Sequence, residues 1–315
     1  MRISINVAHH AWPEGPRGSA AQLDRVVRTA DDIGIDTVWV ADHLLQADPA
    51  GSPGEAMLEA YTTLGFLASR SERVRLGAMA SPVTYRAPGL IVKAVTTLDV
   101  LSGGRAWLGV GAGYAEHEAA AMGLPMPELP ERFERMEDLL RLARRMWAGD
   151  DSPFLGAHTE LARPYASPLP LSAPRPPVLI AGNGEARMLP LVAKYADACN
   201  LLDVPHGGAT LRRKLDILAL HCRKLGRPVS EIDVSASTRL RPEETADELV
   251  AHCRHLADLG IDHVVLVPGG PWTPGVLKTL TQAAPAIRDL NREPQTVSKV
   301  AYIDAYRVPA VSIPV

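Results

Sequence analysis

Short apolar segments alternate with longer amphipathic segments along almost the whole chain. The short segments have the composition of buried parallel strands: Ile3–Ala8, Thr37–Ala41, Val74–Met79, Arg105–Val110, Pro177–Ala181, Ala198–Leu202, Ile232–Ser237 and His263–Val267. The longer segments have apolar residues at helical spacing: Ala20–Ile33, Glu55–Ser69, Pro88–Leu101, Pro130–Trp147, Glu185–Tyr195, Leu211–Leu225, Glu243–Leu259 and Pro274–Leu290. Eight such units in 315 residues predict an α/β fold, a closed (β/α)8 TIM barrel, rather than its rival, an open doubly wound sheet.

The eight units predict one barrel domain over residues 1–290. Residues 149–177, which follow the fourth predicted helix, are rich in proline and irregular, so we expect an insertion there. The tail, residues 291–315, falls outside the eight units and is apolar enough to dock on a partner subunit. We therefore expect a homodimer.

The composition excludes several classes of partner. The net charge is −3 and basic residues form no run, so neither nucleic acid nor an anionic membrane is expected to bind. No stretch approaches 18 apolar residues, and the polar N-terminus does not read as a signal peptide. The three cysteines are widely spaced and odd in number, which argues against a disulfide framework or structural zinc and fits a reducing, cytoplasmic setting.

The segment 74–113 has the pattern of one strand–helix–strand unit with small residues after each strand. The first strand ends in the mostly small or turn-forming run Ala78-Met79-Ala80-Ser81-Pro82, and the second ends in Gly111-Ala112-Gly113. A backbone approaches a flat or phosphorylated ligand closely only where its side chains are small. Ligands of parallel α/β folds bind at the carboxyl ends of the strands, so both strand ends are expected to face a ligand.

Histidines follow the first and second predicted strands. Asp42 and His43 stand where the second strand meets its loop, and His43 is suited to proton transfer near neutral pH. His9 and His10 follow the first strand; adjacent residues of a strand point to opposite faces, so at most one of them would face the mouth as a substrate contact. The other loop histidines show no spacing motif with them, so no metal site is expected.

Gly182, Asn183 and Gly184 lie between a strand and a helix. Free N–H groups at such a helix N-terminus favour a phosphate, whereas the alternative is a plain turn. The run Gly109–Gly113 is weaker, because it matches only part of a dinucleotide fingerprint. Tyr85 and Tyr114 follow the third and fourth strands, within reach of a ligand.

Three segments together resemble the luciferase-like monooxygenase superfamily, and within it the actinobacterial branch that uses the deazaflavin coenzyme F420. They are Gly34–His43 (GIDTVWVADH), residues 74–146 and Pro177–Leu201 (PVLIAGNGEARMLPLVAKYADACNL). The resemblance spans roughly residues 1–290. It implies a (β/α)8 barrel with the coenzyme ring lying across its mouth.

The resemblance also implies roles for particular residues. Met79-Ala80 matches a pair that is joined by a non-prolyl cis peptide in the family, and Ser81 continues that segment. Asp42 and His43 match an acidic residue and histidine near the ring. The glycine-rich segments Gly111–Gly113 and Gly182–Gly184 match the loops near the coenzyme side chain and its phosphate.

The sequence departs from the sugar-phosphate dehydrogenases of the family at one position. Those enzymes carry a glutamate directly after the glycines of the fourth strand, where this chain has Tyr114. Oxidation of glucose 6-phosphate is therefore not expected, and a tyrosine could instead donate a proton to a carbonyl or an imine.

Three hypotheses follow from the sequence. The first is an F420-dependent oxidoreductase that transfers hydride between the coenzyme and a small organic substrate, with His43, Asp42 and Tyr114 in the catalytic site. The second is an FMN-dependent monooxygenase of the same fold, and the third a barrel that binds a coenzyme without turnover.

Overall fold

Eight parallel strands close into a barrel in this computed structural model, which describes residues 1–48, 51–52, 54–182, 184–202 and 208–290. The barrel strands are β1 (Arg2–Val7), β2 (Thr37–Val40), β3 (Arg75–Ala78), β5 (Ala106–Gly111), β8 (Val178–Ala181), β9 (Ala198–Leu202), β10 (Asp233–Leu240) and β11 (His263–Pro268). Each strand pairs with the next in this order, and β11 pairs back with β1. The predicted (β/α)8 barrel is therefore confirmed, and the open-sheet alternative was wrong.

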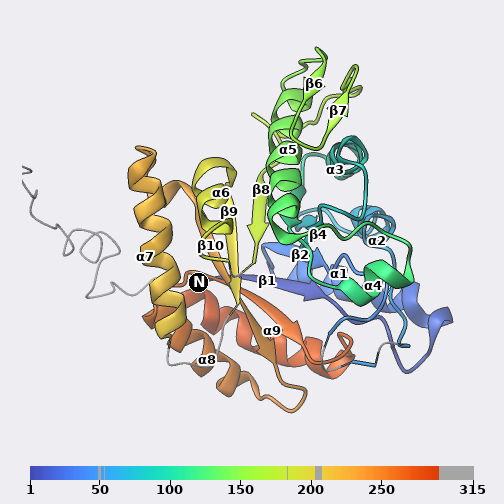
Figure 1. Ribbon diagram of the computed structural model, residues 1–315. Coiled ribbons are helices and arrows are strands. Elements are labelled where there is room, and N and C mark those ends of the chain that lie inside the picture. Colours follow the sequence, from blue (N-terminus) through green and yellow to red (C-terminus); the bar gives the residue numbers. More distant parts are fainter. Residues whose placement is uncertain (49–50, 53, 183, 203–207, 291–315) are drawn as a thin grey trace, which may run out of the picture.

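Helices surround the barrel and cover its outer face (Figure 1). They are α1 (Ser19–Asp32), α2 (Ala60–Ala68), α3 (Pro88–Ser102), α5 (Leu129–Trp147), α6 (Met188–Tyr195), α7 (Ala209–Lys224), α8 (Ala246–Asp258) and α9 (Pro274–Asp289). Local chemistry sets several ends: Thr245 and Glu248 form a capping box at the start of α8, and Gly103 adopts a left-handed conformation at the end of α3.

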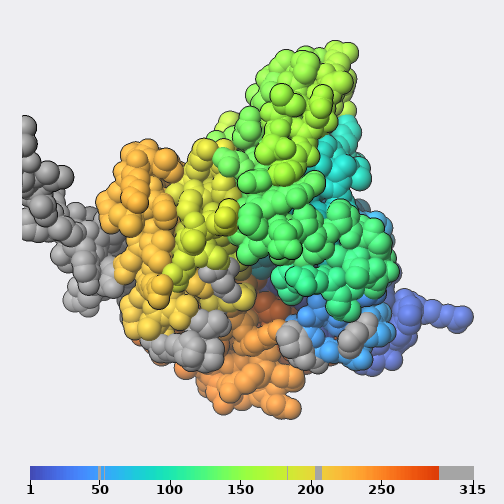
Figure 2. Space-filling view, in the orientation of Figure 1, coloured from blue at the N-terminus to red at the C-terminus, as the bar shows by residue number. Residues whose placement is uncertain are grey.

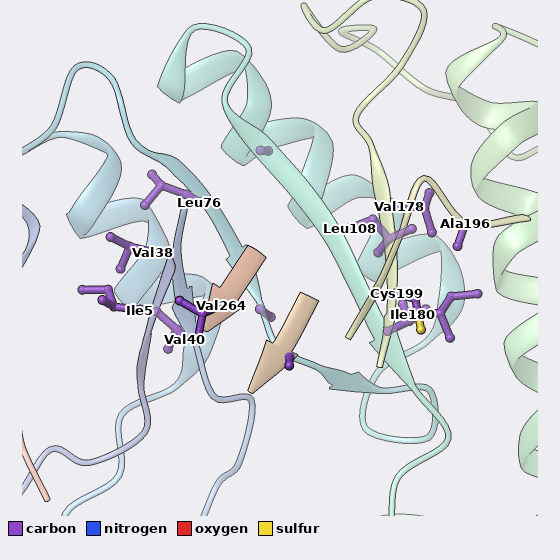
Figure 3. Packing of buried hydrophobic residues seen from close by; sticks show 14 of the residues in the cluster. Ile5, Val38, Val40, Leu76, Leu108, Val178, Ile180, Ala196, Cys199 and Val264 are labelled. Atoms are coloured by element: carbon purple, nitrogen blue, oxygen red, sulfur yellow. The ribbon is translucent and has the colours of Figure 1, made fainter. Parts of the chain in front are cut away.

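The main core lies between the barrel and these helices. Outward-facing strand residues such as Ile5, Val38, Leu76, Leu108 and Ile180 are completely buried there (Figure 3). Residues of a strand alternate between its two faces, so the intervening side chains point into the barrel. The continuous burial of these strands follows from this double coverage.

A second, smaller cluster fills the middle of the barrel. It centres on Trp39 and Trp107, whose ring centroids lie 5.7 Å apart. Gly77 leaves room for this pair, because a β-carbon there would lie 2.7 Å from the Trp39 ring and 2.8 Å from the Trp107 β-carbon. Both tryptophans therefore belong to the core.

A polar layer closes the end of the barrel where the strands begin. Asp233 accepts a hydrogen bond from His263 at 3.1 Å and pairs with Arg2, while Ser4 contacts the other ring nitrogen of His263 at 2.7 Å. Burial alone would raise the pKa of Asp233, but His263 and Arg2 outweigh it and lower that pKa to about 2. The opposite end, at the carboxyl ends of the strands, is left for the functional site.

The structure also contains elements that the periodicity did not predict. A short strand, β4 (Ser81–Pro82), follows β3, and a short helix, α4 (Glu116–Ala121), follows β5. The expected insertion holds the hairpin of β6 (Phe154–Leu155) and β7 (Glu160–Leu161) beside the end of α5 (Figure 1), and 3-10 turns occupy Pro16–Gly18 and Val229–Glu231.

Some predicted elements lie differently or outside the description. The helices α2, α6 and α8 begin at Ala60, Met188 and Ala246, three to five residues after the predicted starts, because Glu59 and Thr245 cap two of them. The tail expected to dock on a partner, residues 291–315, lies outside the described residues. In the described part of the chain, no helix is long and apolar enough to cross a membrane.

Candidate active site

Asp42 and His43 follow β2 at the carboxyl end of the barrel, as the sequence predicted. Their side chains enter two separate hydrogen-bond networks. The carboxylate of Asp42 is buried and contacts β4 and the loop after it, whereas the imidazole of His43 contacts α4 and Tyr114. The expected acidic–histidine pair is thus two neighbouring residues with different surroundings.

The network of Asp42 is a buried ion pair. Arg86 donates two hydrogen bonds to Asp42, at 2.6 and 2.9 Å, and a third to Glu59 at 2.6 Å. Burial opposes the charge of Arg86, but these carboxylates prevail and raise its pKa. The hydroxyl of Ser81 donates to Asp42 at 2.6 Å and lies 3.0 Å from the Tyr61 hydroxyl. This network therefore anchors the start of β4.

Between β3 and β4 the peptide bond Met79-Ala80 is cis, which confirms the conformation that the family resemblance implied. β4 then pairs with β5, Ser81 opposite Val110 and Pro82 opposite Gly111. Gly109 allows the end of β3 to approach β5 closely, because a β-carbon there would collide with the Ala78 carbonyl. We call the two adjacent small-residue segments, 79–81 and 111–113, the small-residue wall.

His43 is held by Glu118, the third residue of α4. Its Nδ1 lies 2.7 Å from Oε2 of Glu118, and the hydroxyl of Tyr85 donates to the same oxygen at 2.7 Å. The other oxygen, Oε1, accepts the backbone N–H of Leu44 and, at 3.1 Å, that of Leu45. Glu118 has no exposed surface and yet is fully hydrogen-bonded.

These contacts determine the charge of Glu118. Burial alone would raise its pKa, but the hydrogen bonds from His43, Tyr85 and Leu44 outweigh burial and lower the pKa to about 2. For Tyr85, burial and the bond to Glu118 both raise the pKa, so its hydroxyl stays protonated. Because an ionised carboxylate only accepts, the contact assigns a proton to Nδ1 of His43.

Tyr114 completes the network on the side that faces solvent. Its hydroxyl lies 3.1 Å from Nε2 of His43, and the two rings meet edge to face at 5.5 Å. In a neutral imidazole with its proton on Nδ1, Nε2 is an acceptor, so the Tyr114 hydroxyl donates to it. Tyr114 is 71% exposed, unlike the buried Tyr85, which contacts Glu118 rather than open space.

A cavity of about 390 Å³ lies beside Tyr114. The loop after β2 lines one side with Gln46, Asp48 and Gly51, and the start of α4 lines the other with Glu116 and His117. Figure 2 shows a hollow between the green segments and the yellow to orange segments, whereas the residues that line the cavity beside Tyr114 all belong to the blue and green parts of the chain.

His9 and His10 lie just beyond β1, and both side chains are buried rather than open to the mouth. His9 contacts Gln46 at 3.2 Å and Asp48 at 3.2 Å, and so helps to position two residues that line the cavity. His10 packs edge to face on Trp12, and burial together with His9 lowers its pKa to about 4. Their role as substrate contacts stays a prediction.

The predicted phosphate turn is only partly described, because Asn183 lies outside the described residues. The N–H of Gly182 donates to the Asn200 carbonyl at 3.3 Å, and Gly184 precedes the first residue of α6, Met188, by one turn. The helix α6 thus begins four residues after Gly184, and the role of Gly182, Asn183 and Gly184 in binding a phosphate stays a prediction.

The other glycine segment has polar groups around it that the sequence did not single out. Arg132, on α5, donates to the carbonyl of Gly113 at 2.8 Å, and the Thr84 hydroxyl would lie 3.8 Å from a β-carbon at Gly113. Nε of Arg132 and the Thr84 hydroxyl are buried without a hydrogen-bond partner among the described residues. Such orphaned groups beside small residues suit an anionic ligand.

Glu118 is the functional residue that sequence reasoning did not select. The sequence offered Glu116 and Glu118 together after Tyr114, and nothing in their spacing separates them. The residue at which α4 begins determines which glutamate is buried: Glu118 faces inward and Glu116 is exposed. Across the residues that the structure describes, no group of three metal-ligating side chains comes together.

Comparisons with known proteins relate this chain to one protein family and to several curated proteins. The family model described as luciferase-like monooxygenase matches residues 1–291. A protein named F420-dependent glucose-6-phosphate dehydrogenase from Amycolatopsis mediterranei is 38% identical over 198 residues, 61% of this chain and 54% of the relative. A relative of the same name from Rhodococcus erythropolis is 29% identical over 269 residues, 83% of this chain and 76% of the relative.

The chain spans about half the length of several curated relatives that it matches, such as the Amycolatopsis protein at 54% and an Intrasporangium calvum protein at 51%. Among solved structures, an F420-dependent secondary alcohol dehydrogenase has a TM-score of 0.78 at 18% identity, covering 91% of this chain and 99% of the other. The F420-dependent tetrahydromethanopterin reductase of Methanopyrus kandleri has a TM-score of 0.74 at 15% identity, covering 90% and 97%.

These structural similarities establish the fold alone, whereas the family model spans all of the described residues. The chain belongs to the luciferase-like monooxygenase family.

Proposed function

We propose that the protein is an F420-dependent oxidoreductase that transfers hydride between the deazaflavin coenzyme and a small organic substrate. The observation that carries this proposal is the imidazole of His43, which buried Glu118 orients at the mouth of the barrel. The names of the relatives support the deazaflavin as the coenzyme, since the curated relatives from Amycolatopsis mediterranei and Rhodococcus erythropolis are both named as F420-dependent enzymes.

The small-residue wall fits such a coenzyme. A β-carbon at Gly111 would lie 3.4 Å from the Ala181 carbonyl and 3.6 Å from the β-carbon of Ala80, so this part of the wall is closely packed. The orphaned Nε of Arg132 and hydroxyl of Thr84 stand beside Gly113, where they could hold a negatively charged side chain. Met79–Ser81 and Gly111–Gly113 would then contact the ring and the start of its side chain.

When bound, the coenzyme supplies or accepts the hydride, and the protein must move the accompanying proton. His43 is the group that we assign to this step, because its Nε2 faces Tyr114 while its Nδ1 is fixed by Glu118. A fixed Nδ1 proton keeps Nε2 available as an acceptor, and the Glu118 carboxylate stabilises the imidazolium that forms when Nε2 takes a proton. Asp42 acts differently, through Ser81 and Arg86, as a positioning residue for β4.

The test is a titration of the purified, coenzyme-free protein with F420 and, separately, with FMN. We expect F420 to bind and, once reduced, to lose its hydride to a suitable acceptor, as followed by absorbance. Tight binding of FMN, together with oxidation of an added substrate by oxygen when reduced FMN is supplied, would instead establish the FMN-dependent monooxygenase. Binding of F420 with no oxidation by carbonyl, imine or alkene acceptors would favour a coenzyme-binding barrel without turnover.

A homodimer forms part of the proposal. Several large apolar side chains are exposed on α3 and on the insertion that packs against it: Leu90, Leu101, Leu155, Leu169 and Leu171. The contact of Lys93 with the Ser167 carbonyl holds these two segments together. Exposed apolar side chains that gather in this way are typical of protein interfaces. Light scattering of the protein and of a Leu101→Glu, Leu155→Glu variant would test this: the variant should be monomeric.

The setting that we propose is the cytoplasm. All three cysteines are buried and unpaired, and burial raises the pKa of Cys199 and Cys253 to about 12. Thiols that are buried and protonated react slowly with oxidants. Because these thiols form no disulfide, an oxidising compartment would give the protein no added stability. Fractionation of the native host with an antibody against the protein would test the location.

A further inference from the structure

The cavity beside Tyr114 is joined directly to the group that moves the proton. The Tyr114 ring lines the cavity, and its hydroxyl lies 3.1 Å from Nε2 of His43. A molecule in this cavity would therefore meet the outer end of the network formed by Glu118, His43 and Tyr114. Its volume of about 390 Å³ lies near the lower end of the range of about 300–1,000 Å³ for ligand pockets, which indicates a small ligand.

The lining of this cavity is acidic. It contains two carboxylates, Asp48 and Glu116, and its described residues include neither lysine nor arginine. A third carboxylate stands close by, because a β-carbon on Gly51 would lie 3.1 Å from Oε2 of Glu55. Charges near the surface act through a high dielectric, but they add up when they share one sign.

Two arginines near the cavity are engaged by carboxylates. Arg239 forms a bidentate pair with Asp48, at 2.6 and 2.9 Å. Arg86 is bound by Asp42 and Glu59. A phosphate in the cavity would thus meet Glu116 and an Asp48 already paired with Arg239, and no arginine of the described lining would bind it, an arrangement that costs affinity.

We infer that this cavity is the substrate pocket and that it selects an uncharged or cationic substrate against a phosphate ester, with the polar atom of that substrate at the Tyr114 hydroxyl. The inference rests on the proposed function in that it treats the ligand of this pocket as the substrate. The charge preference of the pocket does not depend on any coenzyme. It separates this chain from what the names of its glucose-6-phosphate dehydrogenase relatives would lead one to expect.

Three probes with one ring and different charges test the inference: cyclohexylammonium, cyclohexanol and cyclohexyl phosphate. Binding of each to the full chain without coenzyme is followed by ligand-observed NMR at low ionic strength. We expect the ammonium and the alcohol to bind more tightly than the phosphate. Equal binding of all three, tighter binding of the phosphate, or binding of none would overturn the inference.

A charge reversal then locates the preference. Glu116→Lys should raise the affinity for cyclohexyl phosphate relative to cyclohexylammonium roughly tenfold, and added salt should reduce this change. Glu160→Lys, on the exposed β7 strand at the other end of α5, alters the net charge equally and should leave the ratio unchanged (Figure 1). Equal shifts in both variants would show that the overall charge, rather than the pocket, sets the preference.

The two proposals can fail separately. If the probes bind in the expected order but F420 does not bind, the pocket is correct and the coenzyme assignment is wrong. If F420 binds and turns over while the probes show no charge preference, the coenzyme assignment holds and the pocket assignment is wrong.

Discussion

Nδ1 of His43 lies 2.7 Å from Oε2 of Glu118, a carboxylate with no exposed surface. This contact joins the loop after β2 to α4, two segments that lie 75 residues apart in the sequence. It orients the imidazole at the mouth of the barrel and keeps one tautomer in place. The chemistry proposed for the protein depends on this orientation more than on any other single contact.

Replacement of the imidazole tests its role directly. We expect His43→Ala to lower turnover by about 10²-fold or more, because a positioned acid–base group typically contributes that much. Coenzyme affinity, measured by titration, should remain within about threefold, since the small-residue wall is untouched. Turnover equal to that of the unaltered protein would remove His43 from the mechanism.

The charge of Glu118 can be removed with little change of shape. Glu118→Gln should lower kcat about tenfold or more and alter the pH profile, because the imidazolium loses its buried counter-charge. The ¹⁵N chemical shifts of the His43 ring should report loss of the single tautomer. Tyr85→Phe serves as a comparison, since it removes one hydrogen bond to the same carboxylate but leaves its charge. A Gln variant with native ring shifts and a native pH profile would contradict the assignment.

The hydroxyl of Tyr114 can be removed without its ring. Tyr114→Phe should lower kcat/KM about fivefold to tenfold, the amount expected for the loss of one hydrogen bond in the transition state. Because the ring still lines the cavity, binding of cyclohexanol to the coenzyme-free protein should weaken by less than about threefold. An unchanged kcat/KM would show that substrates bypass this hydroxyl.

The small-residue wall can be obstructed at one position. Gly111→Val should weaken F420 binding roughly tenfold or more, because even a β-carbon there reaches contact distance of Ala80 and the Ala181 carbonyl. Gly111→Ala should be milder, since both contacts are of ordinary van der Waals length. Both variants should keep a melting temperature close to that of the parent; full affinity in the valine variant would place the coenzyme elsewhere.

The buried carboxylates predict how stability depends on pH. Glu118 and Asp233 both have folded-state pKa values lowered to about 2, below their ordinary values of 4.5 and 3.8. A depressed carboxyl pKa stabilises the fold fully above the unfolded-state value, and this contribution is lost as the pH falls towards the folded-state value. The free energy of unfolding from urea titrations should therefore decline from about pH 5 to pH 2.

Two substitutions test whether Asp233 causes this loss of stability at low pH. Asp233→Asn should be less stable than the parent at pH 7 and should show a shallower decline towards low pH, because the titrating group is gone. The exposed Glu160→Gln should leave both the stability and its slope unchanged. An Asp233→Asn variant with the parent's slope would show that other groups govern the acid response.

The parts of the fold that depend on local periodicity could be predicted from the sequence. The alternation of strands and helices determines the barrel, and the small residues around Ala80 and Gly111 determine which strand ends can come close together. Contacts between distant segments could not be predicted in this way. The choice of Glu118 over Glu116 depends on where α4 begins, which no apolar repeat indicates.

The sequence likewise did not show that Asp42 and His43 enter different hydrogen-bond networks. Their side chains diverge because Arg86 and Ser81 bind one of them and Glu118 the other, and each partner comes from another part of the chain. Adjacent residues of a sequence motif therefore lie at the same place in the fold but can have different roles.

The tryptophan pair inside the barrel has a consequence for how the protein could diversify. Trp39 and Trp107, fitted against Gly77, make a solid floor below the mouth. A deeper pocket would require the simultaneous replacement of large and small residues on three strands, whereas loops and α4 can change one residue at a time. New specificities are thus expected to arise around an unchanged floor.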